Sequence, residues 1–523
     1  MNPRFLTRRL LPGAAVGLAV ALLVACSGGD NKSDASTSTT STTGPAAADA
    51  PKADVVLSAS KEPTAELDPR YQSYNVEMVE VTGGQFWQPY DAGTGKVTRP
   101  PLDMSSERLR NLAKGLGPAY VRVSGSWANS TYFDATGATG GTPPAGFNAV
   151  LTADQWRGVG KFADAVGAEI VTSFPSSPGT RDAEGNWNPD QAQSLLQFSV
   201  DNKIPVVAAE MFNEPTLPVG MPANYNAADF ARDLAALKPV VKEVDPELKL
   251  VGPGSTAERK PLVISSTFTT AEALQATGKA FDVFSYHAYP KVSKRCGSTE
   301  GPEIALTQEF LNRVPDDADY YRKLRDQWLP GAPMWVTETA QAACGGDQWA
   351  STYRDVIRYV NTLGRLGVGD GDVVFHNTLS ASDYGLLDED GLVPRPNYWA
   401  AVLWARLMGP TVHGLEQPVS TEDFAVYAHC TPDGAQEKGM AYAVVNSSET
   451  ATRTVSTPSG KASVYQLTSD SLDSTSASLN GTVLEVPADG TLPKMSGRAA
   501  DGAIEIPPAT VAFVVDTDAH ACS

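Results

Sequence analysis

The stretch VVAAEMFNEPTL, residues 206–217, decides how the chain is interpreted. Its run of small apolar residues is typical of a buried β-strand, which occurs in a parallel sheet covered on both faces. The run ends in Asn213, Glu214 and Pro215, and proline does not continue a central strand. The pattern therefore indicates a scaffold strand that brings an amide and a carboxylate to the rim of a sheet.

Similar apolar runs alternate with amphipathic segments on both sides of this stretch. Segment 228–244, ADFARDLAALKPVVKEV, is one of several with apolar residues at helical spacing. The strand-like runs lie at 74–81, 119–125, 169–174, 206–213, 248–254, 281–289, 333–339 and 372–379. Eight strands that alternate with helices predict an α/β fold, a (β/α)8 TIM barrel, over residues 70–410.

The pattern changes after residue 410. Short strand-like runs such as FAVYAHC and ATVAFVVDT are separated by turn residues, which predicts a β-sandwich over residues 411–523. The run ADVVLSAS (53–60) precedes a barrel that already has eight strands. We therefore expect residues 54–69 to contribute an N-terminal strand to the sandwich.

The N-terminus reads as an export signal. Residues 1–25 combine three arginines with a short apolar segment, as in a signal peptide. The following LVAC resembles a bacterial lipobox, which implies lipidation of Cys26 and anchoring of the protein to the cell envelope. Simple secretion is the alternative. Residues 26–53 lack large apolar side chains and are predicted to form a flexible, lipid-anchored linker.

Charge and cysteine content exclude some classes of function. The net charge of −19 becomes −22 without the three arginines of residues 1–25, so we expect no nucleic-acid partner. Four further cysteines in an exported chain suggest disulfides, with three possible pairings. We favour Cys430–Cys522, both near the C-terminus, and then Cys296–Cys344. No Cys or His pattern has the spacing of a zinc site, and we expect no metal or cofactor.

Two glutamates follow the predicted strands at the same end of the barrel. Glu214 comes just after the fourth strand and Glu338 lies at the end of the seventh, so both reach the mouth where barrel active sites lie. Paired carboxylates at such a mouth are typical of glycosidic bond cleavage. The alternative is that each glutamate only pairs with a cation at the rim.

Several long segments resemble the heparanase and β-glucuronidase group, glycoside hydrolase family 79, over nearly all of residues 54–523. They are RLRNLAKGLGPAYVRVSGS (108–126), SYHAY (285–289), WVTETAQAACGG (335–346) and DYGLLDEDGLVPRPNYWAAVLWARLMG (383–409). The resemblance implies a retaining hydrolase of β-glucuronosyl linkages, with Glu214 as acid/base and Glu338 as nucleophile. A monomer that acts on glucuronic-acid-containing oligo- or polysaccharides is expected.

The same resemblance implies roles for the neighbouring residues. Asn213 matches the amide that binds the sugar 2-hydroxyl, and Tyr289, with His287 on the same wall, matches a tyrosine near the nucleophile. Arg122, near the end of the second strand, would keep Glu338 ionised because a nearby opposite charge favours the charged form. The remaining matches are the groups that receive the substrate carboxylate (Gly345, Gly346, Tyr384) and those that bind sugar hydroxyls (Glu77, Ser126).

Substrate choice stays open within this resemblance. The family often has a glycine where this chain has Cys344, which a disulfide would compensate. Vertebrate heparanases display basic clusters, and here Lys291, Lys294 and Arg295 are the one candidate. A β-glucuronidase is therefore favoured over an endo-acting heparanase. A related glycosidase for neutral sugars and a non-catalytic carbohydrate-binding protein are further alternatives.

Overall fold

The computed structural model describes residues 53–256, 258–259, 265–368, 373–417, 419, 421–519 and 522. The predicted signal peptide, the lipidation of Cys26 and the linker up to residue 52 lie outside the described residues. In the part of the chain that is described, no helix has both the length and the apolar composition that a membrane crossing requires.

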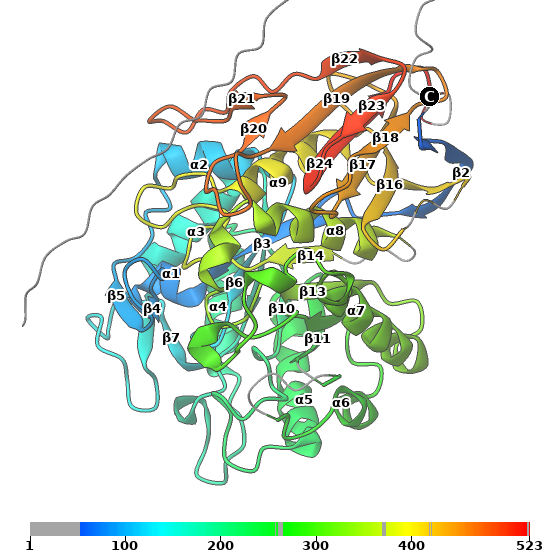
Figure 1. Cartoon of the computed structure of the whole chain (residues 1–523). Helices are drawn as coiled ribbons and strands as arrows, with labels where there is room; N and C mark the ends of the chain where they lie inside the picture. Colours follow the sequence, from blue (N-terminus) through cyan, green and yellow to red (C-terminus); the bar gives the residue numbers. More distant parts are fainter. Residues whose placement is uncertain are drawn as a thin grey trace, which may run out of the picture. The chain divides into compact units, whose positions relative to one another are not determined.

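Eight parallel strands close into a barrel, which confirms the predicted TIM fold (Figure 1). In chain order, which is also the order around the barrel, they are β3 (Gln72–Glu77), β6 (Tyr120–Ser124), β9 (Glu169–Ser173), β10 (Val206–Glu210), β11 (Lys249–Thr256), β12 (Val283–His287), β13 (Met334–Thr339) and β14 (Val373–His376). Each of the eight predicted runs overlaps one of these strands, and six runs contain their strand entirely.

The first barrel strand is shorter than the predicted run 74–81. β3 stops at Glu77, and the short helix α1 (Met78–Thr82) follows. The backbone N–H of Glu77 donates to Glu80 Oε2 at 2.7 Å, and the two glutamates form a reciprocal capping box. This box ends the strand because it satisfies backbone groups at the start of a helix. It also leaves Glu77 at the C-terminal end of the barrel.

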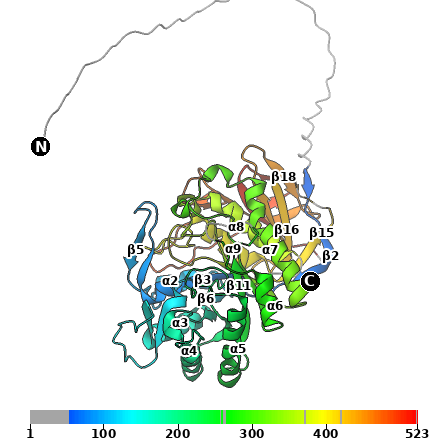
Figure 2. The ribbon, with the colours of Figure 1, turned by 90° about the horizontal axis from the view of Figure 1, so that it is seen from below.

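Helices cover the outside of the barrel. They are α2 (Glu107–Lys114), α3 (Ala153–Val166), α4 (Asp190–Asp201), α5 (Ala227–Val244), α6 (Thr270–Thr277), α7 (Gln308–Trp328), α8 (Arg354–Gly367) and α9 (Pro396–Leu407). α8 contacts strands of the C-terminal sheet and is buried along almost its whole length. Figures 1 and 2 show α5 on the side of the barrel away from that sheet.

The C-terminal region forms two sheets around a second apolar core, as the β-sandwich prediction requires. The larger sheet has the order β2-β15-β16-β17-β24-β19-β20-β21, with β22 beside β19, and the smaller one is β1-β18-β23. These strands are β1 (Val55–Val56), β2 (Ala59–Glu66), β15 (Thr411–Leu415), β16 (Phe424–Cys430), β17 (Met440–Asn446), β18 (Arg453–Ser456), β19 (Lys461–Thr468), β20 (Ser478–Leu479), β21 (Thr482–Val483), β22 (Arg498–Asp501), β23 (Ile504–Ile506) and β24 (Thr510–Asp516).

The N-terminal segment joins both sheets. β1 pairs in parallel with β18, and β2 pairs antiparallel with β15, so the single predicted strand is divided between the two layers. Leu57, between the two strands, is fully buried in the core that the layers share. The segment therefore closes the sandwich at both layers.

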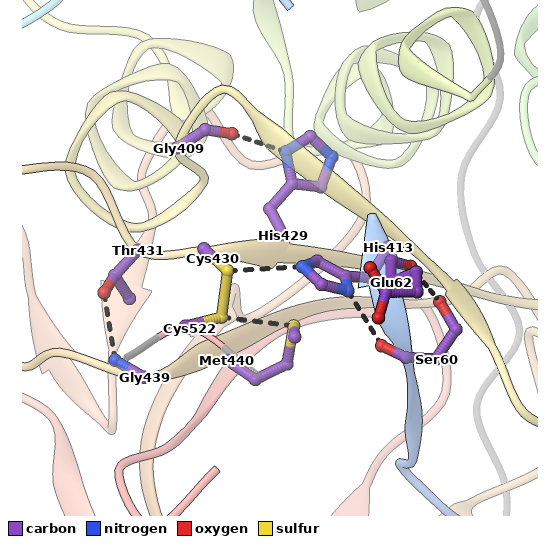
Figure 3. Close-up of a disulfide and its surroundings, with 10 residues drawn as sticks. All are labelled: Ser60, Glu62, Gly409, His413, His429, Cys430, Thr431, Gly439, Met440 and Cys522. Atoms are coloured by element: carbon purple, nitrogen blue, oxygen red, sulfur yellow. Dashed lines mark hydrogen bonds between the residues drawn. A yellow bond between two sulfur atoms is a disulfide. The ribbon is translucent and has the colours of Figure 1, made fainter. Parts of the chain in front are cut away.

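Two disulfides stabilise different parts of the molecule, and both are the favoured pairings. Cys430–Cys522 joins the end of β16 to the C-terminal segment, with His413 Nε2 3.4 Å from the Cys430 sulfur (Figure 3). Cys296–Cys344 joins the loop after β12 to the loop after β13. These two loops lie on the side of the barrel where the candidate site is found.

Two small strand pairs lie at the same end of the barrel. The β4–β5 hairpin (Gly84–Trp87 and Lys96–Arg99) follows the first barrel strand, and β7 with β8 (Thr131–Asp134 and Ala149–Thr152) follows the second. Both pairs therefore add walls around the barrel mouth.

Candidate active site

A cavity of about 1460 Å³ opens at the C-terminal ends of the barrel strands. Both predicted catalytic carboxylates line it, together with side chains from the ends of several strands and from the β4–β5 hairpin. Of the residues predicted from sequence, Glu77, Ser126, Glu214, Tyr289, Glu338 and Tyr384 line the cavity. The volume exceeds that of a single sugar ring and leaves room for a leaving group.

Glu214 and Glu338 face each other across this mouth. One side-chain oxygen of Glu214 and one of Glu338 lie within 4.8 Å of each other. Glu214 has a φ of 48°, a left-handed conformation that is uncommon for a residue with a side chain. Such strain collects at functional sites, where the surrounding structure imposes it. The Glu214 side chain is also more exposed than that of Glu338, at 17% against 7%.

Arg122 occupies the centre of a buried charge network beneath the mouth. Its Nη1 donates to Glu338 Oε1 at 2.9 Å, and its Nε and Nη2 donate to Glu210 Oε2 at 2.9 and 2.7 Å. Burial alone would lower the pKa of Arg122, but the Glu210 and Glu338 carboxylates outweigh it and raise that pKa. Arg122 therefore stays charged and holds Glu338 in place, as the sequence predicted.

Glu210 is a member of this network that the sequence analysis did not identify. Its Oε1 accepts from Ser285 Oγ at 2.9 Å and from Thr337 Oγ1 at 2.8 Å. Burial opposes its charged form, but Arg122 outweighs burial and lowers the pKa of Glu210. The signal was present in VVAAE, because a carboxylate inside an otherwise apolar strand needs a buried partner.

His287 lies behind the carboxylates instead of on the cavity surface. Its Nδ1 is 3.0 Å from Glu214 Oε1 and 3.5 Å from Glu338 Oε2, and its side chain is fully buried. Burial alone would lower the pKa of His287, but the Glu338 and Glu214 carboxylates raise it. The position fits a residue that holds both carboxylates and does not fit the predicted direct contact with a sugar.

A carboxylate, an imidazole and a second carboxylate within 4.8 Å are also a possible ligand set for a metal ion. The Arg122 guanidinium already lies 2.9 Å from Glu338 Oε1 and 3.4 Å from His287 Nε2. A divalent cation at this place would be repelled by that fixed positive charge. The residues therefore fit a pair of free carboxylates better than a metal centre.

Tyr289 and Asn377 connect the nucleophile candidate to the first barrel strand. The Tyr289 hydroxyl donates to Glu338 Oε2 at 2.9 Å. Asn377 Nδ2 contacts the Tyr289 hydroxyl at 3.0 Å, Glu77 Oε1 at 3.1 Å and the Tyr384 hydroxyl at 3.4 Å. Burial and then the Glu338 charge raise the pKa of Tyr289, so its phenol remains a donor. The sequence analysis missed Asn377, whose only signal is an amide directly after the last barrel strand.

Glu77 presents an unsatisfied acceptor to the cavity. Its Oε2 is buried and has no hydrogen-bond partner among the residues that the structure describes. Burial, followed by the Glu338 charge, raises the pKa of Glu77 well above its ordinary value. A buried polar atom without a partner is costly, and a ligand hydroxyl would satisfy it.

Asn213 is buried beside the carboxylates without lining the cavity. Its Oδ1 accepts from Arg122 Nη2 at 2.8 Å, and its backbone N–H donates to Asn129 Oδ1 at 3.0 Å. The Arg122 contact fixes which end of the Asn213 amide is the oxygen. The Nδ2 group is therefore the end that a sugar hydroxyl would meet.

Cys344 lines the cavity, but Gly345 and Gly346, which follow it in the same turn, do not. All three residues have positive φ, at 61°, 81° and 75°. A side chain on Gly346 would lie 2.9 Å from Tyr384 Cβ, and one on Gly345 would lie 2.8 Å from Trp87 Cβ. The glycines are therefore required by close packing, and Cys344 takes a conformation that glycine prefers.

The predicted basic cluster is largely occupied by internal partners. Lys291 Nζ lies 2.9 Å from Asp347 Oδ2, and Arg295 Nη2 lies 2.6 Å from Asp383 Oδ2, with both cationic side chains buried. Of the three cations only Lys294 is exposed. The one candidate for a basic cluster therefore does not form a cationic surface, because the loop uses two of its charges to bind the neighbouring loops.

The sequence of the chain is similar to a known protein family and to individual proteins. The family model described as glycosyl hydrolase family 79, N-terminal domain, matches residues 100–364. Heparanase-like protein 1 of Arabidopsis thaliana is 25% identical over 489 residues, covering 81% of this chain and 86% of that protein. Baicalin-beta-D-glucuronidase of Scutellaria baicalensis is 23% identical over 507 residues, covering 88% and 91%.

A solved structure shares the fold. The 4-O-alpha-L-rhamnosyl-beta-D-glucuronidase from Fusarium oxysporum superposes with a TM-score of 0.64 at 13% identity, covering 89% of this chain and all of that one. At this identity the likeness concerns the arrangement of the barrel and the sheet domain alone.

Proposed function

Because the chain belongs to glycosyl hydrolase family 79, we propose that it is a retaining β-glucuronidase with Glu338 as nucleophile and Glu214 as acid/base. The observation that carries this proposal is a distance: one carboxylate oxygen of Glu214 lies within 4.8 Å of one carboxylate oxygen of Glu338. Catalytic carboxylates are about 5–5.5 Å apart in retaining glycosidases and about 6.5–9.5 Å apart in inverting ones, which need room for a water.

The surroundings of the two carboxylates support different roles. Glu338 accepts hydrogen bonds from the Arg122 guanidinium and the Tyr289 hydroxyl, which fix its carboxylate in one position, as a nucleophile requires. Glu214 contacts His287 Nδ1 at 3.0 Å and lines the cavity, so it can reach a glycosidic oxygen there, as an acid/base requires. The two environments thus separate the two roles.

The proposed reaction has two displacements. Glu338 attacks the anomeric carbon while Glu214 gives its proton to the glycosidic oxygen, and the aglycone leaves as an alcohol or phenol. Glu214, now ionised, takes a proton from water, and the resulting hydroxide displaces Glu338 from the anomeric carbon. The products are β-glucuronate and regenerated enzyme, with the proton back on Glu214.

Recognition of glucuronate rests on the wall opposite the acid/base. We assign the substrate carboxylate to the backbone of the Gly345–Gly346 turn and to Tyr384, whose pKa is raised by burial and by the Glu77 carboxylate. A phenol that stays protonated donates to an anion, and backbone N–H groups can do the same without a cation. The free oxygen of Glu77 would accept from a sugar hydroxyl.

The test is hydrolysis of 4-nitrophenyl β-D-glucuronide beside the matching glucoside. We expect release from the glucuronide alone, β-glucuronate as the first product by proton NMR, and a loss of at least about 10³-fold in Glu338→Gln. Glu505→Gln, at an exposed position of β23, is the matched control. α-Glucuronate as first product would contradict the mechanism, and equal rates on the glucoside would contradict the substrate class.

Endo-acting cleavage is the second candidate, because the cavity volume of about 1460 Å³ can hold more than one sugar. Heparosan and heparan sulfate chains test it: shortening of the chains from within would favour a heparanase-like action. A protein that binds these chains and cleaves none of the substrates would be a carbohydrate-binding protein.

We further propose that the mature protein is a monomer held at the cell envelope by lipid on Cys26. The LVAC segment and the polar residues that follow it support this arrangement. Mass spectrometry of the mature N-terminal peptide tests the lipid, and Cys26→Ala should release the protein from the membrane fraction. An unmodified N-terminus would show simple secretion instead.

A further inference from the structure

The wall beside the acid/base candidate is apolar. The segment directly after Glu214 passes along the cavity and contributes Leu217, Val219, Met221 and Pro222 to its lining. Phe147 and Pro178 line the same cavity from the loops after the second and third barrel strands. Val219 is 47% exposed, which is unusual in this molecule for a large apolar side chain. Single exposed apolar residues are common, but a group of them around a cavity marks a binding surface.

The charged residues near this wall are engaged in contacts within the protein, although Arg181 Nη2 has no hydrogen-bond partner among the described residues. Arg181, which also lines the cavity, donates to Asp233 Oδ2 at 2.9 Å. Asp182 accepts from the backbone N–H groups of Glu184 and Asn186 within its own turn. The wall therefore offers apolar surface and ion-paired charge, which suits an uncharged group better than a sulfated one.

The other lining cation belongs to a different part of the cavity. Lys96 lies on the β4–β5 hairpin after the first barrel strand, 4.6 Å from the centre of the Trp87 ring and 5.0 Å from that of Trp127. Glu214 follows the fourth barrel strand, three positions further around the barrel. The cation and the apolar wall are therefore on different sides of the mouth.

The acid/base marks the side on which the leaving group departs, because it must reach the glycosidic oxygen. We propose that the apolar wall is an aglycone site, and that the preferred substrates are glucuronides whose leaving group is an aryl or alkyl group. This inference rests on the proposed function, since it needs Glu214 as acid/base.

Alkyl β-D-glucuronides of increasing length test the wall directly. Methyl, butyl and hexyl glucuronides have leaving oxygens of similar basicity, so their rates differ mainly through binding of the chain. We expect kcat/KM to rise about two- to fourfold for each added CH₂ until the wall is covered. The double variant Val219→Ser, Met221→Ser should flatten this dependence on chain length.

Val200→Ser is a matched control. Val200 lies on α4, is 45% exposed and does not line the cavity, so it presents the same apolar side chain elsewhere. We expect this variant to keep the wild-type dependence on chain length. A wild-type rate that is independent of chain length, or an equal effect of both sets of substitutions, would overturn the inference.

Calorimetry on Glu338→Gln separates this inference from the proposed function. Tighter binding of hexyl than of methyl glucuronide, with weak binding of hexyl glucoside, supports both. Equal binding of the two glucuronides overturns the apolar aglycone site and leaves glucuronate recognition intact. Equal binding of hexyl glucuronide and hexyl glucoside supports the apolar site and contradicts glucuronate recognition.

Discussion

The barrel mouth and the C-terminal sheets both bury a histidine near a disulfide, but they treat charge in opposite ways. At the mouth, His287 lies between two carboxylates that raise its pKa. In the sheet domain, His429 Nδ1 donates to the carbonyl oxygen of Gly409 at 2.7 Å and the ring packs beside Trp404, and burial lowers the pKa of His429 to about 4. Around the Cys430–Cys522 disulfide, His413 Nε2 lies 3.4 Å from the Cys430 sulfur, and the Met440 sulfur lies 4.0 Å from the Cys522 sulfur (Figure 3).

Because of this difference, we expect the mouth to determine activity and the sheets to contribute to stability. The mouth buries charged groups that the proposed reaction uses, and Arg122 is paired there with Glu210 and Glu338. The sheet core is apolar and contributes burial. Changes at the mouth should therefore alter activity, while changes in the sheets should alter stability alone.

Arg122→Met should have the largest effect. It leaves Glu210 and Glu338 buried without their shared cation, and breaking a buried pair in this way costs about 3–5 kcal/mol of folding free energy. We expect loss of activity together with a much lower midpoint of urea unfolding. Arg453→Met, which breaks the half-exposed Arg453–Asp423 pair in the sheet domain, should cost about 1 kcal/mol or less and leave activity unchanged. Equal losses would remove the distinction between the regions.

Cys430→Ser with Cys522→Ser should lower stability without changing catalysis. The bond joins residues 92 positions apart, and loss of such a cross-link costs about 2–5 kcal/mol. We expect a lower melting temperature and an unchanged kcat/KM for the fraction that remains folded. A lower kcat/KM at temperatures where the variant is fully folded would show that the sheets influence the mouth.

Cys296→Ser with Cys344→Ser, in contrast, should lower catalysis as well as stability. The bond closes a stretch of 48 positions, and halving a loop changes closure entropy by only about 0.6 kcal/mol, so the stability loss should be similar. Both cysteines line the cavity, and the turn at 344–346 packs against Trp87 and Tyr384. We expect kcat/KM to fall about tenfold because a near-ångström misplacement at a site is costly.

Cys296→Ser with Cys344→Gly sharpens this result. Glycine adopts the positive φ of residue 344 without strain, so this pair should recover part of the lost kcat/KM. Equal activity of the serine and glycine pairs would mean that the disulfide does not act through the turn.

The fold was largely predictable from the sequence because both repeating patterns are strong. Runs such as 206–213 and 333–339 begin with several apolar residues in succession, which is typical of a parallel barrel strand covered on both faces. The run 74–81 was predicted as one strand, but the Glu77–Glu80 capping box ends the strand at Glu77 and starts a short helix. The division of the N-terminal segment between two sheets depends on long-range pairing with β15 and β18, which local pattern does not contain.

The sequence predicted site residues that belong to a family motif. It missed residues whose importance depends on contacts between different strands. Glu214, Glu338 and Arg122 meet as expected from their strand ends. Glu210 and Asn377 were missed, because their importance comes from partners on other strands. The sequence left the basic loop open as a candidate site, because sequence charge does not reveal that Lys291 and Arg295 are paired with Asp347 and Asp383.

The smallest expected effects are opposite dependences of stability on pH. Burial raises the pKa of Glu80, beside the mouth, to about 7. Between about pH 4.5 and 7 the native state keeps a proton that the unfolded state has lost, so this contribution falls as pH rises. His429 behaves in the reverse way, because its lowered pKa makes the unfolded state bind more protons between about pH 4 and 6.5.

Glu80→Gln and His429→Asn isolate the two contributions in urea unfolding across pH 4–8. The free energy of unfolding of Glu80→Gln, relative to wild type, should rise with pH up to about 7. That of His429→Asn should rise as pH falls below about 6.5. Each slope should approach about 1 kcal/mol per pH unit. Because the wild-type contributions oppose each other over this range, the unmodified protein shows little of either slope. Parallel slopes in the two variants would mean that charge is not what distinguishes the mouth from the sheets.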